Sequence, residues 1–211
     1  MENDTPNKIK ISKEIIATLP IETFPGKIIV IDNERDADNA VLQLNNEKII
    51  GFDTETRPTF KKGKSNHVAL IQLSTHDTCY LFRINRIGFT PAIKNLLENE
   101  SLLKVGISLK DDFCMLSRLN SGQFIPRNFI ELQKFVKKYN IEDQSLQKIY
   151  GIVIGKKISK GQRLSNWEAD HLTENQQLYA ATDAWSCIKI YEVLKSGKFK
   201  FPIYKIQPSS L

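Results

Sequence analysis

Apolar and polar residues are distributed along the chain in a way that predicts short strands and helices. Short runs rich in β-branched and other apolar side chains are typical of strands, and they occupy residues 27–31, 48–54, 68–74, 78–82, 103–106 and 128–131. Apolar residues at helical spacing predict helices at 11–19, 34–44, 91–98, 109–119 and 173–194, and one more helix that ends at residue 138. Asn33 is suited to cap the second helix, and Thr173 with Gln176 fits a capping box at the start of the last.

The order of these elements predicts how the strands pair. Residues 75–77 leave room only for a tight turn, so the strands on either side should run antiparallel. Beyond residue 90 strands and helices alternate, which favours parallel additions to the same sheet. We therefore expect an α/β fold, a mixed β-sheet flanked by helices on both faces. Residues 1–211 should form a single domain whose residues 1–10 are loose.

Composition narrows the class of protein. No apolar run approaches the ~20 residues that span a bilayer, and the polar first residues lack the apolar core of a secretory signal. The three cysteines are widely spaced and odd in number, which favours small buried side chains over a disulfide frame or a zinc site. We expect a cytoplasmic protein without a membrane partner. The net charge of +6 is compatible with nucleic acid, although lysines also serve solubility.

Carboxylates at the end of one predicted strand are the first candidate for chemistry. Asp53 and Glu55 follow the apolar residues Ile49, Ile50 and Phe52. Because side chains alternate along a strand, both carboxylates should lie on the same face of the sheet. An isolated pair of this kind would ordinarily turn toward solvent, so this pair gains weight only together with other acidic residues.

Further acidic residues occur in two predicted helices. Tyr179 and Asp183 are four residues apart in the last helix and therefore share a face. Asp112 lies in the first turn of the helix after strand 103–106, where a carboxylate also suits the helix dipole. Its neighbour Asp111 competes for the same role, and we favour Asp112 because Phe113 defines the inward stripe beside it.

Carboxylates gathered from separate segments suit hard divalent cations such as Mg²⁺ or Mn²⁺. Two such ions about 4 Å apart can activate a water and stabilise the leaving oxygen in phosphodiester hydrolysis. Without cations the carboxylates would repel one another. The four acidic residues and Tyr179 therefore favour a nuclease, whereas the three histidines lack a metal-ligand spacing and should be non-catalytic.

These segments resemble the three motifs of the DEDD exonuclease superfamily, DEDDy subgroup. Residues 53–56 match the first motif, residues 109–112 resemble the second with Asp112 at the acidic position, and residues 179–183 match the third, YxxxD. Ser108 departs from the pattern, because many relatives carry asparagine there. The resemblance covers about residues 27–195.

Two further stretches resemble the Werner-type branch of this subgroup, which also includes ribonuclease D. One is residues 68–73 (VALIQL), and the other runs from Ser165-Asn166-Trp167 through residues 172–176 into Tyr179. This resemblance implies a ribonuclease H-like fold and a metal-dependent 3′-5′ exonuclease that releases nucleoside 5′-monophosphates from DNA or RNA 3′ ends.

The resemblance also implies roles for the candidate residues. Asp53, Glu55 and Asp183 would bind one of two ions, Mg²⁺ or Mn²⁺, with Asp53 bridging to the second. Asp112 would hold the second ion, and Tyr179 would orient the attacking water. Thr56 would lie near the 3′-terminal nucleotide, and Lys110 would approach phosphate.

Basic, glycine-containing loops could follow the nucleic-acid backbone, or could equally be solvated loops. They contain Lys61, Lys62 and Lys64 around Gly63, and Lys156, Lys157, Lys160 and Arg163 around Gly155 and Gly161. Two other readings stay open: a catalytically silent nucleic-acid-binding adaptor that keeps the fold, and an interaction module with a coincidental acidic cluster. The short chain leaves targeting or processivity to a protein partner.

Overall fold

The computed structural model describes residues 8–57 and 67–199, and a mixed β-sheet forms its centre. Within these residues the sheet has the strand order β1-β4-β3-β2-β5-β6. Its strands are β1 (Lys27–Ile31), β2 (Ile49–Thr56), β3 (Val68–Ser74), β4 (Thr78–Phe82), β5 (Leu103–Gly106) and β6 (Phe129–Glu131). β2, β3 and β4 pair antiparallel, whereas β1, β5 and β6 are added in parallel. The predicted antiparallel pairing around residues 75–77 and the later parallel additions are confirmed.

Helices connect these strands and pack on them. They are α1 (Lys13–Thr18), α2 (Glu34–Leu44), α3 (Ile84–Ile87), α4 (Pro91–Glu98), α5 (Leu109–Leu119), α6 (Leu132–Phe135), the 3₁₀ helix η1 (Val136–Tyr139), α7 (Leu146–Ile154) and α8 (Glu174–Lys195). Asn33 caps α2, and the capping box of Thr173 with Gln176 starts α8, as the sequence predicts. No element was predicted from the sequence at α3 or at α7.

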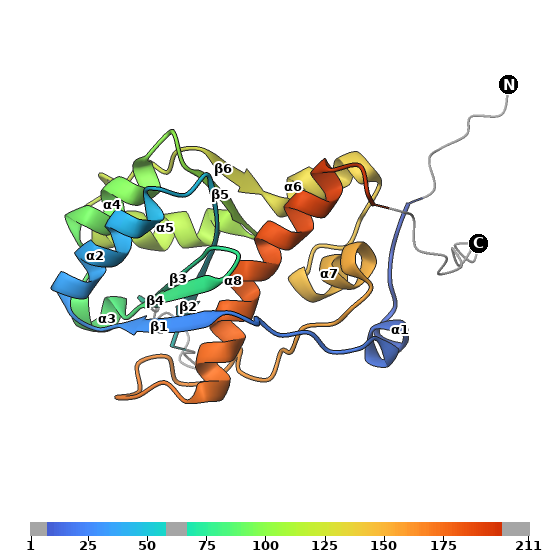
Figure 1. Ribbon diagram of the computed structural model, residues 1–211, viewed down its shortest axis with the longest axis horizontal. Coiled ribbons are helices and arrows are strands. Elements are labelled where there is room, and N and C mark those ends of the chain that lie inside the picture. Colours follow the sequence, from blue (N-terminus) through green and yellow to red (C-terminus); the bar gives the residue numbers. More distant parts are fainter. Residues whose placement is uncertain (1–7, 58–66, 200–211) are drawn as a thin grey trace, which may run out of the picture.

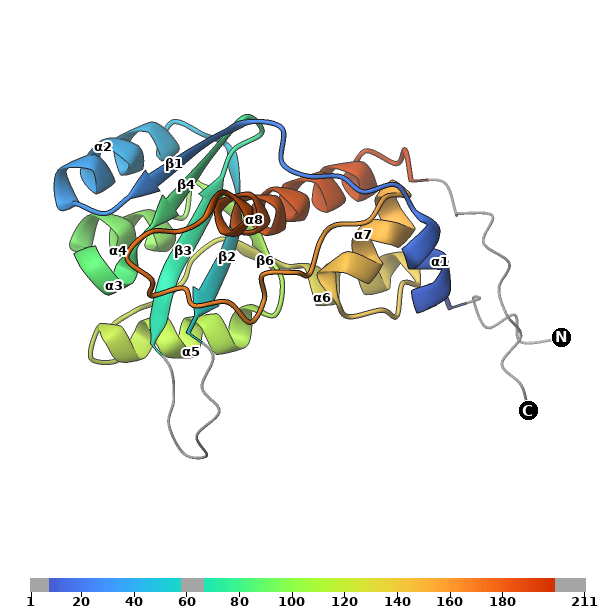
Figure 2. The same cartoon turned by 90° about the horizontal axis from the view of Figure 1, so that it is seen from below.

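Two hydrophobic cores cover the two faces of the sheet. One joins the sheet to α2, α4 and α5, and the other joins it to α8 and α7. Figures 1 and 2 show α8 crossing the strands, with α2 and α4 on one side of it and α7 and α1 beyond it on the other. The predicted α/β class, with helices on both faces of a mixed sheet, is confirmed.

A glycine brings α8 close to β2. A Cβ atom added to Gly51 would lie 1.9 Å from the backbone oxygen of Ala184, so no larger residue fits without moving the helix or the strand. Ala184 directly follows Asp183, and Gly51 lies two residues before Asp53. The contact therefore fixes the distance between the two segments that carry these carboxylates.

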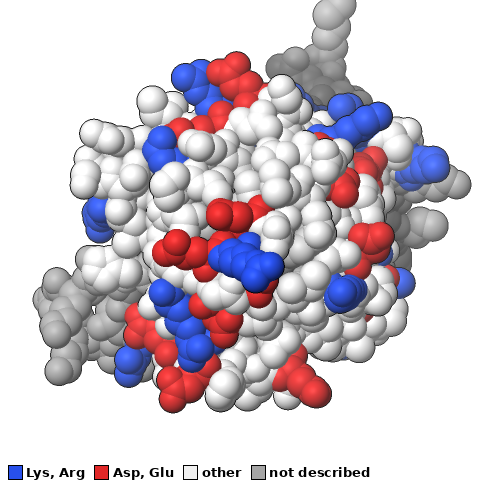
Figure 3. All heavy atoms as spheres, turned by 60° about the vertical axis from the view of Figure 1, so that its left-hand side comes forward, with Lys and Arg blue, Asp and Glu red and all other residues white. Residues whose placement is uncertain are grey.

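The described surface carries charges of both signs. On the face shown in Figure 3, Lys and Arg side chains are interspersed with Asp and Glu and form no continuous positive surface. Residues 8–10, part of the segment predicted to be loose, are held by a pairing of Ile9 with Ile141 and by ion pairs from Lys8 and Lys10 to Glu142, whereas residues 1–7 lie outside the described residues. None of the helices in the described residues is long and apolar enough to cross a membrane.

Candidate active site

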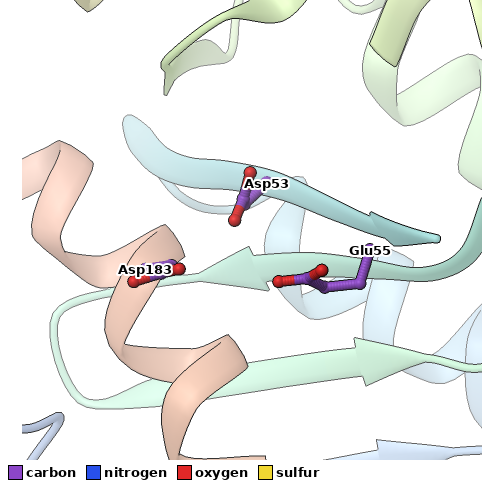
Figure 4. Close-up of side chains that lie close together, drawn as sticks. All are labelled: Asp53, Glu55 and Asp183. Carbon is purple, nitrogen blue, oxygen red and sulfur yellow. The ribbon is translucent and has the colours of Figure 1, made fainter. Parts of the chain in front are cut away.

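Three carboxylates meet where β2 runs beneath α8. Asp53 and Glu55 lie on the face of β2 toward α8, and Asp183 projects from the helix to meet them (Figure 4). One oxygen of each carboxylate lies within 4.8 Å of the others. Asp183 is 8% exposed, and the other two side chains are partly buried. The period-two spacing along the strand produces this convergence, because it keeps Asp53 and Glu55 on one face.

Asp112 approaches the cluster from the opposite layer of the fold. It lies in the first turn of α5, is 9% exposed, and accepts a hydrogen bond from the Thr54 hydroxyl. Its carboxylate falls outside the group that lies within 4.8 Å, yet its charge raises the pKa of both Asp53 and Glu55. Asp111 is exposed. The structure therefore turns Asp112, and not Asp111, toward the other carboxylates.

The start of α5 is held by a carboxylate from β6. Ser108 precedes the helix with φ of 60°, a left-handed conformation that asparagine tolerates better than serine. Glu131 accepts hydrogen bonds from the backbone N–H groups of Ser108, at 3.1 Å, and Leu109, at 2.8 Å. These bonds replace the missing side-chain cap and fix the first turn, which carries Asp112.

Burial and mutual repulsion favour the protonated forms of the four carboxylates. Burial and the charges of Asp183, Glu55 and Asp112 raise the pKa of Asp53 well above its usual value. Burial and the same kind of repulsion raise the pKa of Glu55 to about 9, and burial raises the pKa of Asp183 to about 7. Burial also raises the pKa of Asp112 to about 6, although the bond from Thr54 opposes the shift.

This donor set fits divalent cations. Three carboxylates at one point, with that of Asp112 nearby, concentrate hard oxygen atoms, and a bound cation would remove their mutual repulsion. Nearby basic side chains offset only part of it: Arg163 lowers the pKa of Glu55, and Lys160 lowers that of Asp183. Asp53, Glu55 and Asp183 are the group of described residues able to share one ion.

Tyr179 completes the cluster from one turn earlier in α8. Its ring lies one turn before Asp183 on the same face of the helix, and the side chain is 7% exposed. Burial and the charges of Asp183 and Glu55 raise the pKa of the Tyr179 phenol. The hydroxyl therefore stays protonated at neutral pH, which suits it to positioning a polar group and excludes it as a base.

The remaining predicted residues lie in different environments. Thr56 is partly buried at the end of β2, and Lys110 is exposed in the first turn of α5. In the second basic loop, Lys156 pairs with Glu22 at 2.7 Å and Lys157 donates a hydrogen bond to a backbone oxygen of α1. The structure therefore commits these two lysines to the fold and leaves the other two basic residues of that loop near the carboxylates. The loop of Lys61, Lys62 and Lys64 lies outside the described residues.

The residues that support the carboxylates were not predicted from the sequence. Thr54 was included only as part of the first motif, and Glu131 only as the last residue of a predicted strand. Both act across the fold, on Asp112 and on the start of α5, and no local spacing announces such contacts. Trp167, whose ring packs against Tyr179, was visible only through the family resemblance.

Comparison with known proteins identifies the family. Residues 28–197 match the model of a family described as 3′-5′ exonuclease. The chain belongs to this family. It is 35% identical over 201 residues to the bifunctional 3′-5′ exonuclease/ATP-dependent helicase WRN of Mus musculus, and these residues cover 90% of this chain and 14% of that protein. The chain thus spans only a small part of this relative. The resemblance to DEDDy-type exonucleases is confirmed.

Solved structures show the same fold. The Aedes aegypti Nibbler EXO domain superposes with a TM-score of 0.74 at 24% identity, covering 83% of this chain and 91% of that one. Trypanosoma brucei RNase D in complex with RNA U12 superposes with a TM-score of 0.71 at 19% identity, covering 81% of this chain and 63% of that one. The ribonuclease H-like fold implied by the resemblance is therefore confirmed.

Proposed function

We propose that this chain is a metal-dependent 3′-5′ exonuclease domain. It would hydrolyse the last phosphodiester bond at a nucleic-acid 3′ end and release a nucleoside 5′-monophosphate. The observation that carries the proposal is the convergence of Asp53, Glu55 and Asp183 within 4.8 Å in a member of the 3′-5′ exonuclease family. Burying these mutually repelling carboxylates has no structural benefit, which favours a role in binding cations.

The four carboxylates divide into ligands for two ions, Mg²⁺ or Mn²⁺. Asp53, Glu55 and Asp183 would hold one ion, and Asp112 with Asp53 would hold the second. When bound, such ions lower the pKa of an attacking water and stabilise the negative charge on the leaving oxygen. Thr54 orients Asp112 for this role through its hydroxyl.

Tyr179 would position the attacking water. Its hydroxyl stays protonated because burial and the charges of Asp183 and Glu55 raise its pKa, and a protonated hydroxyl can both donate a hydrogen bond to water and accept one. A positioned water attacks the phosphorus more readily because the reacting atoms are already oriented. Replacing Tyr179 with Phe should therefore lower kcat more than it raises KM.

Nucleic acid is the substrate class that this site favours. Lys160 and Arg163 are exposed and close enough to the carboxylates to shift their pKa values, which suits contacts to phosphates next to the scissile bond. The RNA complex of the similar Trypanosoma brucei RNase D supports the same class. Thr56, at the end of β2, would contact the terminal nucleotide, and Lys110 a phosphate.

A labelled-strand assay tests the proposal. The full chain is incubated with strands carrying a 3′-terminal label, in Mg²⁺, Mn²⁺ or chelator, and the products are separated by size. We expect metal-dependent release of labelled mononucleotide, lost in Asp53→Ala and Asp183→Ala. Asp111→Asn is the matched control for Asp112→Asn, because Asp111 is exposed beside it. Unchanged digestion by Asp53→Ala or Asp183→Ala would overturn the proposal.

The substrate panel separates this function from the adaptor alternative. Matched DNA and RNA strands, single-stranded, blunt and recessed, are each digested with each metal. Salt-dependent binding without any mononucleotide release would identify a silent adaptor and contradict the exonuclease. Faster release from one nucleic acid would identify the preferred 3′ end, because the 2′-hydroxyl is the group by which a protein distinguishes RNA from DNA.

A further inference from the structure

The segment that precedes α8 is fastened to the start of that helix. Gln176 is 5% exposed, and its side-chain oxygen accepts a hydrogen bond from the backbone N–H of Thr173, which completes the capping box. Its side-chain nitrogen donates to the hydroxyl of Ser165 and to the backbone oxygen of Asn166, both at 3.2 Å. One side chain therefore caps α8 and fixes the residues directly before Trp167.

The other end of the segment is also held. Arg83, directly after β4, is 2% exposed and donates a hydrogen bond to the backbone oxygen of Ala169 at 2.5 Å. Arg86 donates to the backbone oxygen of Asp170. Trp167 thus lies between two anchored points, and its position is set by the fold on both sides.

Trp167 fills the space beside Tyr179. The indole is 0% exposed, and its ring centroid lies 6.0 Å from that of Tyr179 with the planes tilted by 36°. The indole N–H makes no hydrogen bond to the described residues. The contribution of Trp167 is therefore packing, which another aromatic ring can reproduce in part.

We propose that Trp167, fastened by Gln176, is a positioning residue that holds the Tyr179 ring in the orientation required for catalysis. The inference rests on the proposed function, because it gives the Ser165-Asn166-Trp167 stretch a role in positioning the catalytic Tyr179. Tyr179 lies one turn after Gln176, so helix cap, segment and tyrosine form one unit. Trp167 itself touches neither water nor substrate, since it is fully buried.

A double-mutant cycle tests the proposal. Trp167→Leu should lower kcat about tenfold or more with KM unchanged, because displacement of a positioning group weakens the chemical step and not binding. Trp167→Phe should recover most of kcat. In a Tyr179→Phe background, which lacks the hydroxyl, Trp167→Leu should cost little further. An equal loss of kcat in both backgrounds would overturn the proposal, since Trp167 would then act only on the general fold.

A second variant keeps the test valid where Trp167→Leu fails to fold. Gln176→Glu retains the oxygen that accepts from Thr173 and places a negative charge at a helix N-terminus, where it is favourable. It loses the nitrogen that donates to the hydroxyl of Ser165 and to the backbone oxygen of Asn166. We expect it to lower kcat in the wild-type background and not in Tyr179→Phe. Equal losses in both backgrounds would contradict the proposal.

Two controls separate this inference from the function on which it rests. Phe124→Leu removes a buried ring from the core on the other face of the sheet and should leave kcat unchanged. Metal-induced stabilisation should persist in Trp167→Leu, because the four carboxylates remain, and its loss would contradict a role confined to Tyr179. An inactive wild-type chain would overturn the proposed function, whereas an active chain with additive variants would overturn this inference alone.

Discussion

The Thr54 hydroxyl donates a hydrogen bond to the carboxylate of Asp112, and this bond links the two layers of the site. Thr54 lies between Asp53 and Glu55 in β2 and faces the opposite side of the sheet. One strand therefore directs two carboxylates toward α8 and, through the residue between them, orients a third on α5. The end of β2 is the point at which both cores of the molecule contribute to the candidate site.

Removing the Thr54 hydroxyl should weaken the site without dismantling it. Thr54→Val leaves Asp112 without its hydrogen bond. Loss of a residue that hydrogen-bonds to a metal ligand typically lowers metal affinity or activity about 10- to 100-fold. We expect a lower kcat and a higher Mg²⁺ concentration for half-maximal release of mononucleotide. Thr54→Ser keeps the hydroxyl and should behave like wild type. An identical Mg²⁺ dependence of Thr54→Val and wild type would contradict this role.

The acidic cluster should destabilise the metal-free chain at neutral and alkaline pH. Folding raises the pKa values of Asp53 and Glu55, so the unfolded chain releases these protons first and stability falls as pH rises from about 4 toward 9. Asp53→Asn removes one buried negative charge. In chelator at pH 8 its melting temperature should therefore exceed that of wild type, by a margin that shrinks at pH 5.

Bound metal should make wild type more stable than Asp53→Asn. Mn²⁺ at about 100 times its dissociation constant stabilises a folded site by about 2.7 kcal/mol. Wild type should gain this stabilisation, whereas Asp53→Asn, which lacks the shared ligand, should gain much less. Thermal unfolding with chelator and with Mn²⁺ measures both effects. Equal Mn²⁺-induced shifts in the two chains would show that Asp53 does not bind the ion.

Glu22 should make folding sensitive to acid. Although burial favours its protonated form, hydrogen bonds from Lys156, Lys189 and Tyr150 lower its pKa from 4.5 to about 2. A depressed pKa stabilises the fold above pH 4.5, and this contribution, on the order of 3 kcal/mol, is lost as pH falls toward 2. Urea unfolding should therefore show Glu22→Gln much less stable than wild type at pH 6.5. The difference should shrink below pH 4, and a difference independent of pH would refute the assignment.

Gly51 should be intolerant of any side chain. Its added Cβ would overlap the backbone oxygen of Ala184, so Gly51→Ala must push α8 away from β2. We expect a loss of about 1–3 kcal/mol in unfolding free energy and a marked loss of exonuclease activity, since Asp183 moves with the helix. Gly161→Ala is the control for stability, because its Cβ would meet only the Ser159 hydroxyl at 3.4 Å. Wild-type stability and activity in Gly51→Ala would contradict the close approach.

The sequence predicted the elements best where one local signal dominated. The capping box at Thr173 and Gln176 located α8, and strand periodicity placed Asp53 and Glu55 on one face. Helix α7 was not predicted, because its β-branched residues, such as Ile152 and Val153, favour strands locally. Burial against α8 overrides that preference, and it is visible only in the folded chain.

The acidic residues that meet at the candidate site could be named from the sequence, whereas the residues that support them could not. The acidic residues carry motif spacings, so each could be named from its own segment. The bond from Thr54 to Asp112 joins residues 58 positions apart, and the bonds from Glu131 to the start of α5 cross between two elements. Such contacts depend on tertiary packing, and no periodicity encodes them.

Counting bound Mn²⁺ by electron paramagnetic resonance tests the central claim most directly. Wild-type chain is titrated with Mn²⁺ in the presence of a nucleoside 5′-monophosphate, beside Asp112→Asn and Asp53→Asn. We expect two ions per wild-type chain, one in Asp112→Asn, and little binding in Asp53→Asn. Binding in Asp53→Asn equal to that of wild type, or no Mn²⁺ bound by wild type at millimolar concentration, would contradict the account.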